Sequence, residues 1–508
     1  MSFVTALSLA GCQSGQKPSE PCKITINLQE GDPPTLNPYV GVDLRSRCLF
    51  LALYEPLMRK NEDGSLSYAA AESVDIDPSQ KIYTFHLRTQ RWSNGELVTS
   101  RHFADAWKYA LTPGTPCIRA DLFYPIQNAE QVKKGELPMD ALKLFTPDDS
   151  TLVVELDYPI PYFLELTATS FFAPLYELNE KDPTCFNGPF TLSERTRDVS
   201  LTLSKNPLYW DANSVRLDQV VFTLVKDPMT AYSLFERGEI DVIGDPFSSL
   251  PIEVLPSLDA SGRLRSKLIS RIFYLLLNTT APPFDNAKFR KALGFSIDRA
   301  AVTKDLFYGE LATLSCIPKT LSLLEEEALK IEDPRRLLEE ALLEMGLTRE
   351  TLPKITLSYA ELSGQKRFAE FIQQEWGEKL GIEIDVVGSQ WNTHIVNLRK
   401  RNYNIGTFHF TTLYQDPMFY FEFFKDARAL GNYTGWEHPE VMGLIEQSNR
   451  SIDPKERREM MVQIEQKIFD EMPAIGLFTQ NLQYLVQEGV NLVISDLGIY
   501  DLKKTGYR

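Results

Sequence analysis

The chain has 508 residues, of which 43% are apolar and 24% are charged, a balance typical of a globular protein with roughly two to four domains. Its 69 acidic and 53 basic residues give a net charge of −16, which would repel an extended polyphosphate and therefore argues against nucleic-acid binding. No apolar run approaches the roughly 18 residues of a membrane-spanning helix, which argues against a polytopic membrane protein.

The N-terminal segment is the first to carry a specific signal. Met1-Ser-Phe-Val-Thr-Ala-Leu-Ser-Leu-Ala-Gly-Cys12 is short and apolar, ends in small residues and is followed by polar residues. Its last four residues resemble a bacterial lipobox, in which the cysteine thiol becomes the acyl carrier. The alternative is an ordinary buried cysteine. We expect residues 1–21 to be a lipoprotein signal and tether, with Cys12 lipidated.

The other five cysteines give no metal or redox motif. Cys22, Cys48, Cys117, Cys185 and Cys316 form no C-x-x-C pair, so a zinc ribbon and a thioredoxin-type motif fail on spacing. Because five is odd, at least one of these thiols is unpaired. One disulfide is compatible with an oxidising compartment, but the spacing does not choose the pair.

Short strands dominate the first half of the chain. Residues 23–28 alternate between apolar and polar side chains, which predicts a strand, and the glycine and prolines of 29–38 predict a loop at its end. Residues 82–88 and 151–157 alternate in the same way. Residues 231–237 are followed by a glycine and predict a helix.

A strand–helix–strand unit follows in the second half. Asp333 and Pro334 are typical of a helix start, and Gly346 is typical of its end. Residues 355–359 then predict a strand, the apolar side chains of 368–380 recur at helical spacing, and the alternation returns after Gly381. Such a βαβ crossover requires a parallel or mixed sheet, so the chain is at least partly α/β.

The sequence lacks the local motifs of common enzymes. It contains no G-x-x-x-x-G-K-[ST], no H-E-x-x-H and no G-x-S-x-G. Its five histidines, at 86, 102, 394, 409 and 438, include no pair at helical spacing. We therefore expect no catalytic residue, no metal site and no cofactor. An exported hydrolase stays an alternative, because a spatial triad leaves no sequence motif.

One segment, residues 391–424, is dense in aromatic side chains: WNTHIVNLRKRNYNIGTFHFTTLYQDPMFYFEFF. Such a stripe is most often part of a core, but ligand pockets are also mostly apolar and aromatic, with a few polar groups. Gln415-Asp-Pro417 interrupts the stripe with a loop, where functional residues tend to lie.

Short blocks along almost the whole chain resemble those of the family 5 solute-binding proteins, the extracytoplasmic receptors of peptide-importing ABC transporters. Each block is a weak signal alone, but together they follow the family's order. They are Pro34-Thr-Leu-Asn-Pro38, Leu53-Tyr-Glu-Pro-Leu57, Arg91-Trp-Ser-Asn-Gly-Glu96, Lys205-Asn-Pro-Leu-Tyr-Trp-Asp211, Phe235-Glu-Arg-Gly-Glu-Ile-Asp241 and Arg290-Lys-Ala-Leu-Gly-Phe-Ser-Ile-Asp-Arg299.

The resemblance implies an α/β, two-lobed periplasmic-binding-protein-like fold with an additional domain and a hinge of two crossing strands. The crossings are expected near 271–278 and 474–486. The expected units are lobe I from 22–56, 177–270 and 478–508, the additional domain from 57–176, and lobe III from 271–477. Ligand contacts with both lobes would stabilise the closed state of an open–closed equilibrium.

The resemblance also implies a site in which a peptide lies as an added strand. Carried over by position, one side is the loop after the first strand, and the other is the segment ahead of Pro417, with Trp391 as a pocket wall and Asp416 as the nearest acid. The expected residues are Gly31, Asp32, Pro33 and Pro34, and then His409, Phe410, Thr411, Thr412, Leu413 and Tyr414.

The chain departs from the family at positions that read peptide termini. Many peptide-binding members place an aspartate four residues before the matching proline to hold the α-ammonium, and here that residue is Leu413. The family's cleft arginines correspond to Leu398 and Thr407. We therefore hypothesise that free peptide termini are not read in the usual way, and that the ligand is modified, cell-wall-derived or differently anchored.

The resemblance implies a lipid-anchored receptor, not an enzyme, that captures oligopeptides and delivers them to the membrane permease of a peptide ABC importer. We expect a monomer in the periplasm or at the cell surface, held to a bacterial membrane by its lipid, with no nucleic-acid partner. Receptors for murein peptides, nickel or opines are alternatives on the same fold, and an adhesin or a signalling lipoprotein is an alternative from another class.

Overall fold

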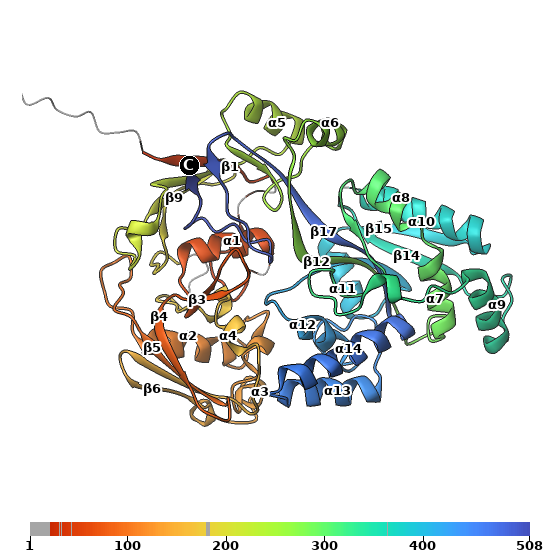
Figure 1. Ribbon diagram of the computed structural model, residues 1–508, viewed down its shortest axis with the longest axis horizontal. Helices are drawn as coiled ribbons and strands as arrows, with labels where there is room; N and C mark the ends of the chain where they lie inside the picture. The colour runs from red at the N-terminus through yellow and green to blue at the C-terminus, as the bar shows by residue number, and fades with distance from the viewer. Residues whose placement is uncertain (1–20, 30, 32, 42, 179–182, 363) are drawn as a thin grey trace, which may run out of the picture.

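The computed structural model describes residues 21–29, 31, 33–41, 43–178, 183–362 and 364–508, so the predicted lipidation site Cys12 lies outside the described residues. One large mixed sheet runs through both lobes, and a smaller antiparallel sheet forms the additional domain (Figure 1). The large sheet contains, in spatial order, β15 (Ile384–Ser389), β14 (Ile355–Ala360), β16 (Ile405–Thr411), β12 (Arg265–Leu277), β17 (Ala474–Val486), β11 (Val242–Gly244), β1 (Lys23–Asn27), β10 (Gln219–Thr223), β9 (Ser200–Lys205) and β8 (Phe190–Thr196), with β13 (Leu311–Ala312) beside β17.

Lobe III contains the predicted βαβ unit. β14 and β15 are parallel and are joined by α10 (Gln365–Leu380), which ends at Gly381 with φ +69°. The preceding helix α9 (Pro334–Met345) begins at Asp333, whose side chain accepts from the Arg335 amide, and ends at Gly346. Other helices of this lobe are α7 (Ala287–Ser296), α8 (Arg299–Ala301), α11 (Trp391–Arg399), α12 (Met418–Phe421), α13 (Pro439–Arg450) and α14 (Pro454–Glu471).

Lobe I is assembled from distant parts of the chain. β1 is parallel to both β10 and β11, and α1 (Leu44–Leu53), α5 (Pro228–Glu236) and α6 (Leu255–Ala260) lie in the same lobe. The helix predicted at 231–237 begins earlier, because Pro228 at the first turn and the Asp227 cap extend it. Short strands β18 (Val490–Asn491) and β19 (Gly506–Tyr507) pair near the C-terminus.

A buried ion-pair cluster ties the early chain to the C-terminal segment. Arg59 lies in the short hairpin of β2 (Met58–Lys60) and β3 (Leu66–Tyr68). Its guanidinium donates to Glu55 at 2.6 Å and to Asp501 at 3.2 Å. All three side chains are buried, so each charge depends on this geometry for its stabilisation.

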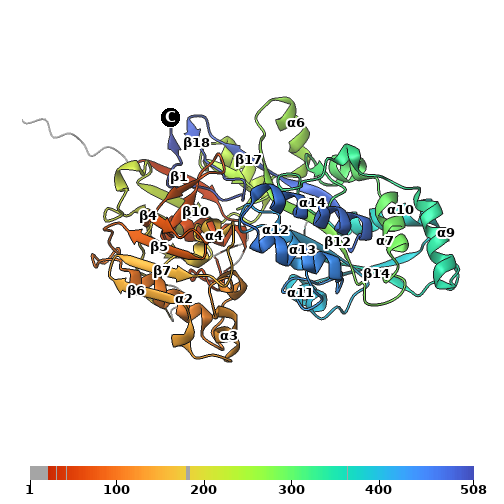
Figure 2. The same cartoon turned by 60° about the horizontal axis from the view of Figure 1, so that its bottom comes forward.

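The additional domain is built on a four-stranded antiparallel sheet (Figure 2). Its order is β4 (Ala71–Ile76), β5 (Ile82–Leu87), β7 (Thr151–Glu155) and β6 (Leu144–Asp148), so both strands predicted by alternation are present. The helices α2 (Ser100–Leu111), α3 (Ala129–Lys134) and α4 (Phe163–Leu166) accompany the sheet. Trp107 of α2 is fully buried, and its indole donates to the Phe172 carbonyl at 3.2 Å.

The two lobes are joined by two long antiparallel strands, β12 and β17 (Figure 1). β17 has the bounds that the family resemblance implied, and β12 begins six residues earlier than the expected crossing. On the other edge of β17, β13 pairs with residues 478–479 and β11 pairs with residues 484–486. Neither short strand covers the stretch between them.

Two carboxylates, which we call the hinge carboxylates, accept hydrogen bonds from the backbone of that uncovered stretch of β17. The Asn481 amide donates to the Glu310 carboxylate at 2.6 Å, and the Gln483 amide donates to the Asp245 carboxylate at 3.2 Å. Burial raises the pKa of both groups, to about 6 for Asp245 and well above the ordinary value for Glu310. Glu310 belongs to the predicted lobe III and Asp245 to the predicted lobe I, so both lobes place an acid at the hinge.

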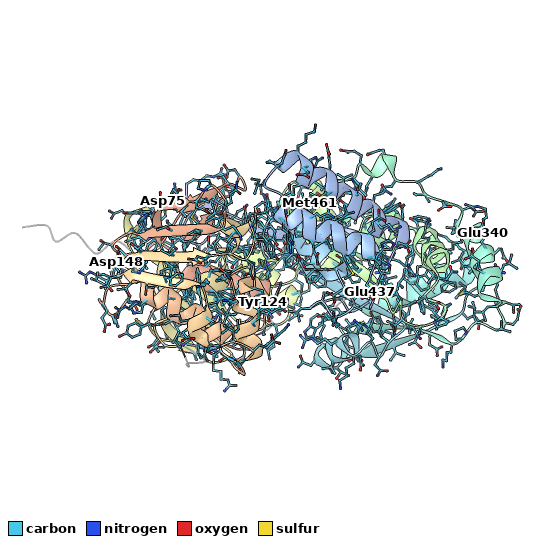
Figure 3. All side chains as sticks on the ribbon, turned by 90° about the horizontal axis from the view of Figure 1, so that it is seen from below. Asp75, Tyr124, Asp148, Glu340, Glu437 and Met461 are labelled. Carbon is cyan, nitrogen blue, oxygen red and sulfur yellow. The ribbon has the colours of Figure 1, made fainter. Side chains whose placement is uncertain are left out.

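The additional domain and lobe III are in direct contact. The rings of Tyr162 and Tyr414 stack with centroids 4.7 Å apart and an interplanar angle of 6°. The Arg119 guanidinium lies 5.4 Å from the centre of the Phe419 ring. From below, the domain that carries Tyr124 lies beside the helix that carries Met461 (Figure 3).

The five described cysteines are all free thiols, so no disulfide forms within the described part of the chain. None of the helices described is both long and apolar enough to span a bilayer. Across the ranges given above, no three His, Cys, Asp or Glu side chains are grouped as a metal site would require.

Candidate functional site

A cavity of about 820 Å³ lies where lobe I, the additional domain and lobe III meet. Its wall includes Asp43 and Leu44 at the start of α1, and Ile118 and Arg119 from the additional domain. Most of the remaining wall comes from lobe III, between Trp391 and Tyr433. The volume lies within the range of about 300–1,000 Å³ typical of ligand sites, so the cavity can hold a small ligand between the two sides.

One wall of the cavity is aromatic. Phe408 and Phe410 lie two residues apart on β16 and therefore on the same face of that strand. Trp391, at the start of α11, is parallel to Phe408 at 6.2 Å, with an interplanar angle of 7°. Phe423 lies 3.9 Å from Phe410 and Tyr433 lies 5.3 Å from Phe408, measured between ring centroids. The wall can therefore receive apolar side chains.

The charged groups of the cavity are mainly arginines. The described lining residues include five arginines and one acidic residue, Asp43. Arg119 donates to both carboxylate oxygens of Asp121, at 2.8 and 2.6 Å. The other four are Arg271 on β12, Arg399 at the end of α11, Arg401 just beyond it, and Arg428. A ligand in this cavity therefore meets a surplus of cationic side chains.

His409 also lines the cavity, but its side chain lies on the other face of β16 from Phe408 and Phe410. Its ring stacks on Phe273 with centroids 4.4 Å apart, and its Nε2 lies 3.4 Å from the Gln365 Nε2 atom. Burial lowers the pKa of His409 well below its ordinary value, and the nearby charge of Arg271 acts in the same direction. The imidazole is therefore uncharged at neutral pH and adds no positive charge to the cavity.

The structure brings five of the twelve predicted ligand residues to the cavity: Trp391, His409, Phe410, Thr411 and Leu413. Thr412, Tyr414 and Asp416 lie beside it but contact other parts of the protein. The Thr412 carbonyl accepts from Arg47 at 3.3 Å, and Asp416 accepts from Arg457 at 2.8 Å. Asp416 is thus paired within lobe III. The ligand contacts of all these residues stay predictions.

The described residues of the loop after β1 lie outside the wall of this cavity. Pro33 is buried and its carbonyl accepts from Arg195 at 3.2 Å, whereas Pro34 is exposed. Gly31 has φ +91°, a conformation that favours glycine. Asp32 lies outside the described residues. A ligand role for this loop also stays a prediction.

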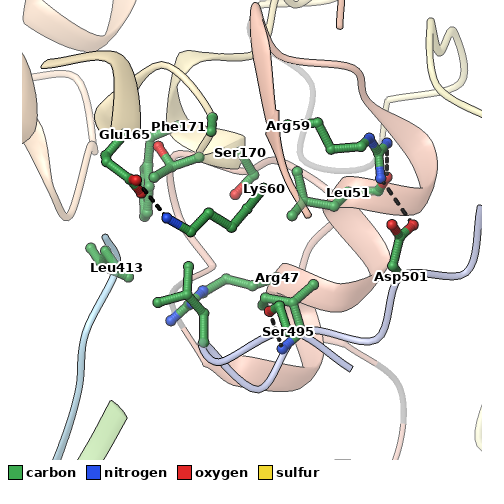
Figure 4. A pocket seen from close by; sticks show the side chains of 14 residues that line it. Arg47, Leu51, Arg59, Lys60, Glu165, Ser170, Phe171, Leu413, Ser495 and Asp501 are labelled. Carbon is green, nitrogen blue, oxygen red and sulfur yellow. Dashed lines mark hydrogen bonds and ion pairs between the residues drawn. The ribbon is translucent and has the colours of Figure 1, made fainter. Parts of the chain in front are cut away.

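Leu413 lines both the cavity and a second, small pocket of about 40 Å³ (Figure 4). Within this pocket, Lys60 pairs with Glu165 at 2.5 Å. Arg47 is also part of its wall, and burial lowers the pKa of Arg47 to about 10. The surroundings of Leu413 therefore contain a buried cation, which disfavours a second positive charge there.

The arginines were missed by sequence reasoning because they come from separate parts of the fold. Arg119 and Arg271 are 152 positions apart, and only the contact of the additional domain with lobe III brings them to one cavity. A local signal exists only for Arg399-Lys-Arg401, at the C-terminal end of the helix that begins at Trp391. That basic run beside an aromatic segment could have suggested an anion-binding wall.

Known proteins are similar to this chain over nearly its whole length. A family model described as bacterial extracellular solute-binding proteins, family 5 Middle, matches residues 65–432. The oligopeptide-binding protein OppA of Bacillus subtilis is 33% identical over 492 residues, covering 93% of this chain and 90% of that protein.

Solved structures agree in fold. A Haemophilus influenzae OppA complex with the peptide RPPGFSPFR has a TM-score of 0.81 at 22% identity, covering 96% of this chain and 99% of that chain. The murein tripeptide binding protein MppA of Escherichia coli has a TM-score of 0.84 at 22% identity, with the same coverages. The two-lobed fold is therefore shared with these proteins.

Proposed function

The chain belongs to family 5 of the bacterial extracellular solute-binding proteins, and from that premise we propose that it captures oligopeptides and delivers them to the membrane permease of an ABC importer. The observation that supports this most directly is the cavity of about 820 Å³, which residues from both sides of the molecule line. We further propose that the protein is a monomer without enzymatic activity, anchored through Cys12 to a bacterial membrane in the periplasm or at the cell surface.

Binding would stabilise the closed arrangement. The same proposal assigns lobe I to 22–56, 177–270 and 478–508, the additional domain to 57–176, and lobe III to 271–477. A ligand held by Arg119 on one side and by Trp391 and Phe408 on the other contacts both sides only when they are closed. Ligand affinity then shifts the open–closed equilibrium, and the closed form is the one a permease would recognise.

The amino terminus of a peptide would not be held at Leu413. A desolvated α-ammonium needs a charged partner, and a leucine side chain supplies none. The buried Arg47 on the other side of Leu413 adds an unfavourable charge. Peptides would therefore be held by their backbone and side chains, and an N-terminal modification would cost little affinity.

The proposal is tested by identifying and then rebinding a ligand. Mass spectrometry of small molecules released from the purified full chain should detect peptides. Each candidate peptide should raise the melting temperature, because a ligand at about 100 times its dissociation constant stabilises the folded state by roughly 2.7 kcal/mol. Chromatography should recover the peptide unchanged, whereas a hydrolase would cleave it. Failure of every peptide to shift the melting temperature would contradict the proposal.

The lipid anchor is tested separately. The full chain expressed in a bacterium should enter the detergent phase on Triton X-114 partitioning, and Cys12→Ser should remain in the aqueous phase. Cys22→Ser, ten positions further along, is the matched control and should partition as the parent chain does. Aqueous partitioning of the parent chain would contradict the anchor and leave the ligand proposal unaffected.

A further inference from the structure

The cavity is cationic although the protein as a whole is acidic. The chain carries a net charge of −16, yet five arginines and one aspartate are the charged residues among the described parts of the lining. His409 does not add to the positive charge, because burial lowers its pKa well below the ordinary value. The sign of the local charge is therefore opposite to that of the whole chain.

Ion pairs inside the protein neutralise only part of this charge. Arg119 is paired with Asp121, and Arg428 lies 3.9 Å from the Asp426 carboxylate at the surface. Arg399 is exposed and forms no ion pair with any residue that the structure describes. Arg401 donates to the carbonyl oxygens of Ala427 and Asn432, which hold the guanidinium in place but leave its charge uncompensated. At least two positive charges at the cavity thus lack an acid.

The positions of these charges favour a ligand that carries carboxylates. Guanidinium groups bind carboxylates through paired, charge-assisted hydrogen bonds, and a cleft of one sign concentrates ions of the other sign. The arginines come from the additional domain, the hinge strand and lobe III, so closure without a compensating anion brings like charges together. An anionic ligand removes this repulsion.

We propose that the cavity selects peptides that carry a side-chain carboxylate, in addition to the terminal one, next to an apolar or aromatic residue. The aromatic wall of Trp391, Phe408 and Phe410 would receive the apolar side chain, and the arginines would receive the acid. This inference rests on the proposed function, because it requires that peptides bind in this cavity.

The test compares peptides that differ in one charge. The full chain is titrated calorimetrically with Ala-Phe-Glu-Phe-Ala, Ala-Phe-Gln-Phe-Ala and Ala-Phe-Lys-Phe-Ala, each with a free and with an amidated C-terminus. We expect the Glu peptide to bind at least about tenfold more tightly than the Gln peptide, and the Lys peptide to bind most weakly, with either C-terminus. Added salt should reduce the Glu preference.

Variants assign the preference to the cavity. Arg399 and Arg428 are exposed, so the double variant Arg399→Gln/Arg428→Gln should fold, and it should reduce the ratio of Glu-peptide to Gln-peptide affinity several-fold. Arg101→Gln changes an exposed arginine on α2 of the additional domain, outside the cavity wall, and should leave the ratio unchanged.

The outcomes separate this inference from the proposed function. Equal affinities for the Glu and Gln peptides would overturn the inference while peptide binding stands. A preference that disappears on C-terminal amidation would place the recognised carboxylate at the terminus and would also overturn it. An unchanged ratio of Glu-peptide to Gln-peptide affinity in the double variant would overturn the assignment of the preference to these arginines. Absence of binding by all six peptides would contradict the proposed function itself.

Discussion

Ionisation of Asp245 at the hinge should make the folded state less stable as the pH rises. Asp245 is held against the Gln483 amide of β17, and burial raises its pKa from 3.8 to about 6, with Arg271 only partly opposing the change. The folded protein therefore retains a proton that the unfolded chain releases between about pH 4 and pH 6. The stabilisation is complete below the lower value and is lost as the pH rises through the upper one.

The magnitude follows from the two pKa values. A change from 3.8 to about 6 corresponds to about 3 kcal/mol of unfolding free energy. Asp245→Asn keeps an oxygen that can accept from the Gln483 amide and removes the charge. We expect this variant to be close to the parent chain in stability near pH 4, and more stable by up to about 3 kcal/mol at pH 7.5.

Urea unfolding at pH 4.5, 6.0 and 7.5 measures this difference. Asp140→Asn, at an exposed position in the additional domain, is the matched control and should leave the pH dependence unchanged. Parallel stability profiles for Asp245→Asn and the parent chain would refute the reasoning. Glu310→Gln should act in the same direction, because burial and the nearby Asp245 both raise the pKa of Glu310.

Three further predictions concern other parts of the structure. Gly476→Ala on β17 should destabilise the fold by several kcal/mol, because the added Cβ would lie 2.0 Å from a backbone oxygen. Gly443→Ala on α13, where the added Cβ has room, is the control, and thermal unfolding compares the two variants. Arg59→Met should cost about 3–5 kcal/mol in chemical denaturation, because it leaves two buried carboxylates without their cation. Leu413→Asp should strengthen binding of peptides with a free amino group relative to their N-acetylated forms, and an unchanged calorimetric ratio would contradict the role given to this position.

Local sequence signals predicted the elements whose ends are marked by the chain itself. The helix before Gly346 and the βαβ unit around Gly381 follow from apolar spacing and from glycines that adopt positive φ. β17 is found over the full range that the family resemblance implied. The start of α5 was placed three residues late, because the apolar pattern begins only after the Pro228 turn.

The site was only partly predictable. Apart from Tyr433, the aromatic wall lies within one continuous segment, 391–424, whose composition is more typical of a core but also fits a pocket. The charge of the cavity was missed, because Arg119 and Arg271 reach it through tertiary contacts that no local pattern encodes. In the same way, the sequence offered Asp416 as the nearest acid, but a helix about 40 residues further along supplies Arg457, which pairs with it.

The strands of the large sheet come from distant parts of the chain, which affects the order in which the lobes can fold. β1 at residues 23–27 pairs with strands near 219–223 and 242, and the Arg59–Asp501 ion pair joins residues 442 positions apart. Residues 271–477, in contrast, contain the βαβ unit without interruption. During synthesis that segment can form its contacts while the earlier strands still lack their C-terminal partner, β17. Strand pairing between such distant segments slows folding and leaves sheet edges exposed until β17 has been synthesised. Truncation at the C-terminus should therefore damage the N-terminal lobe first.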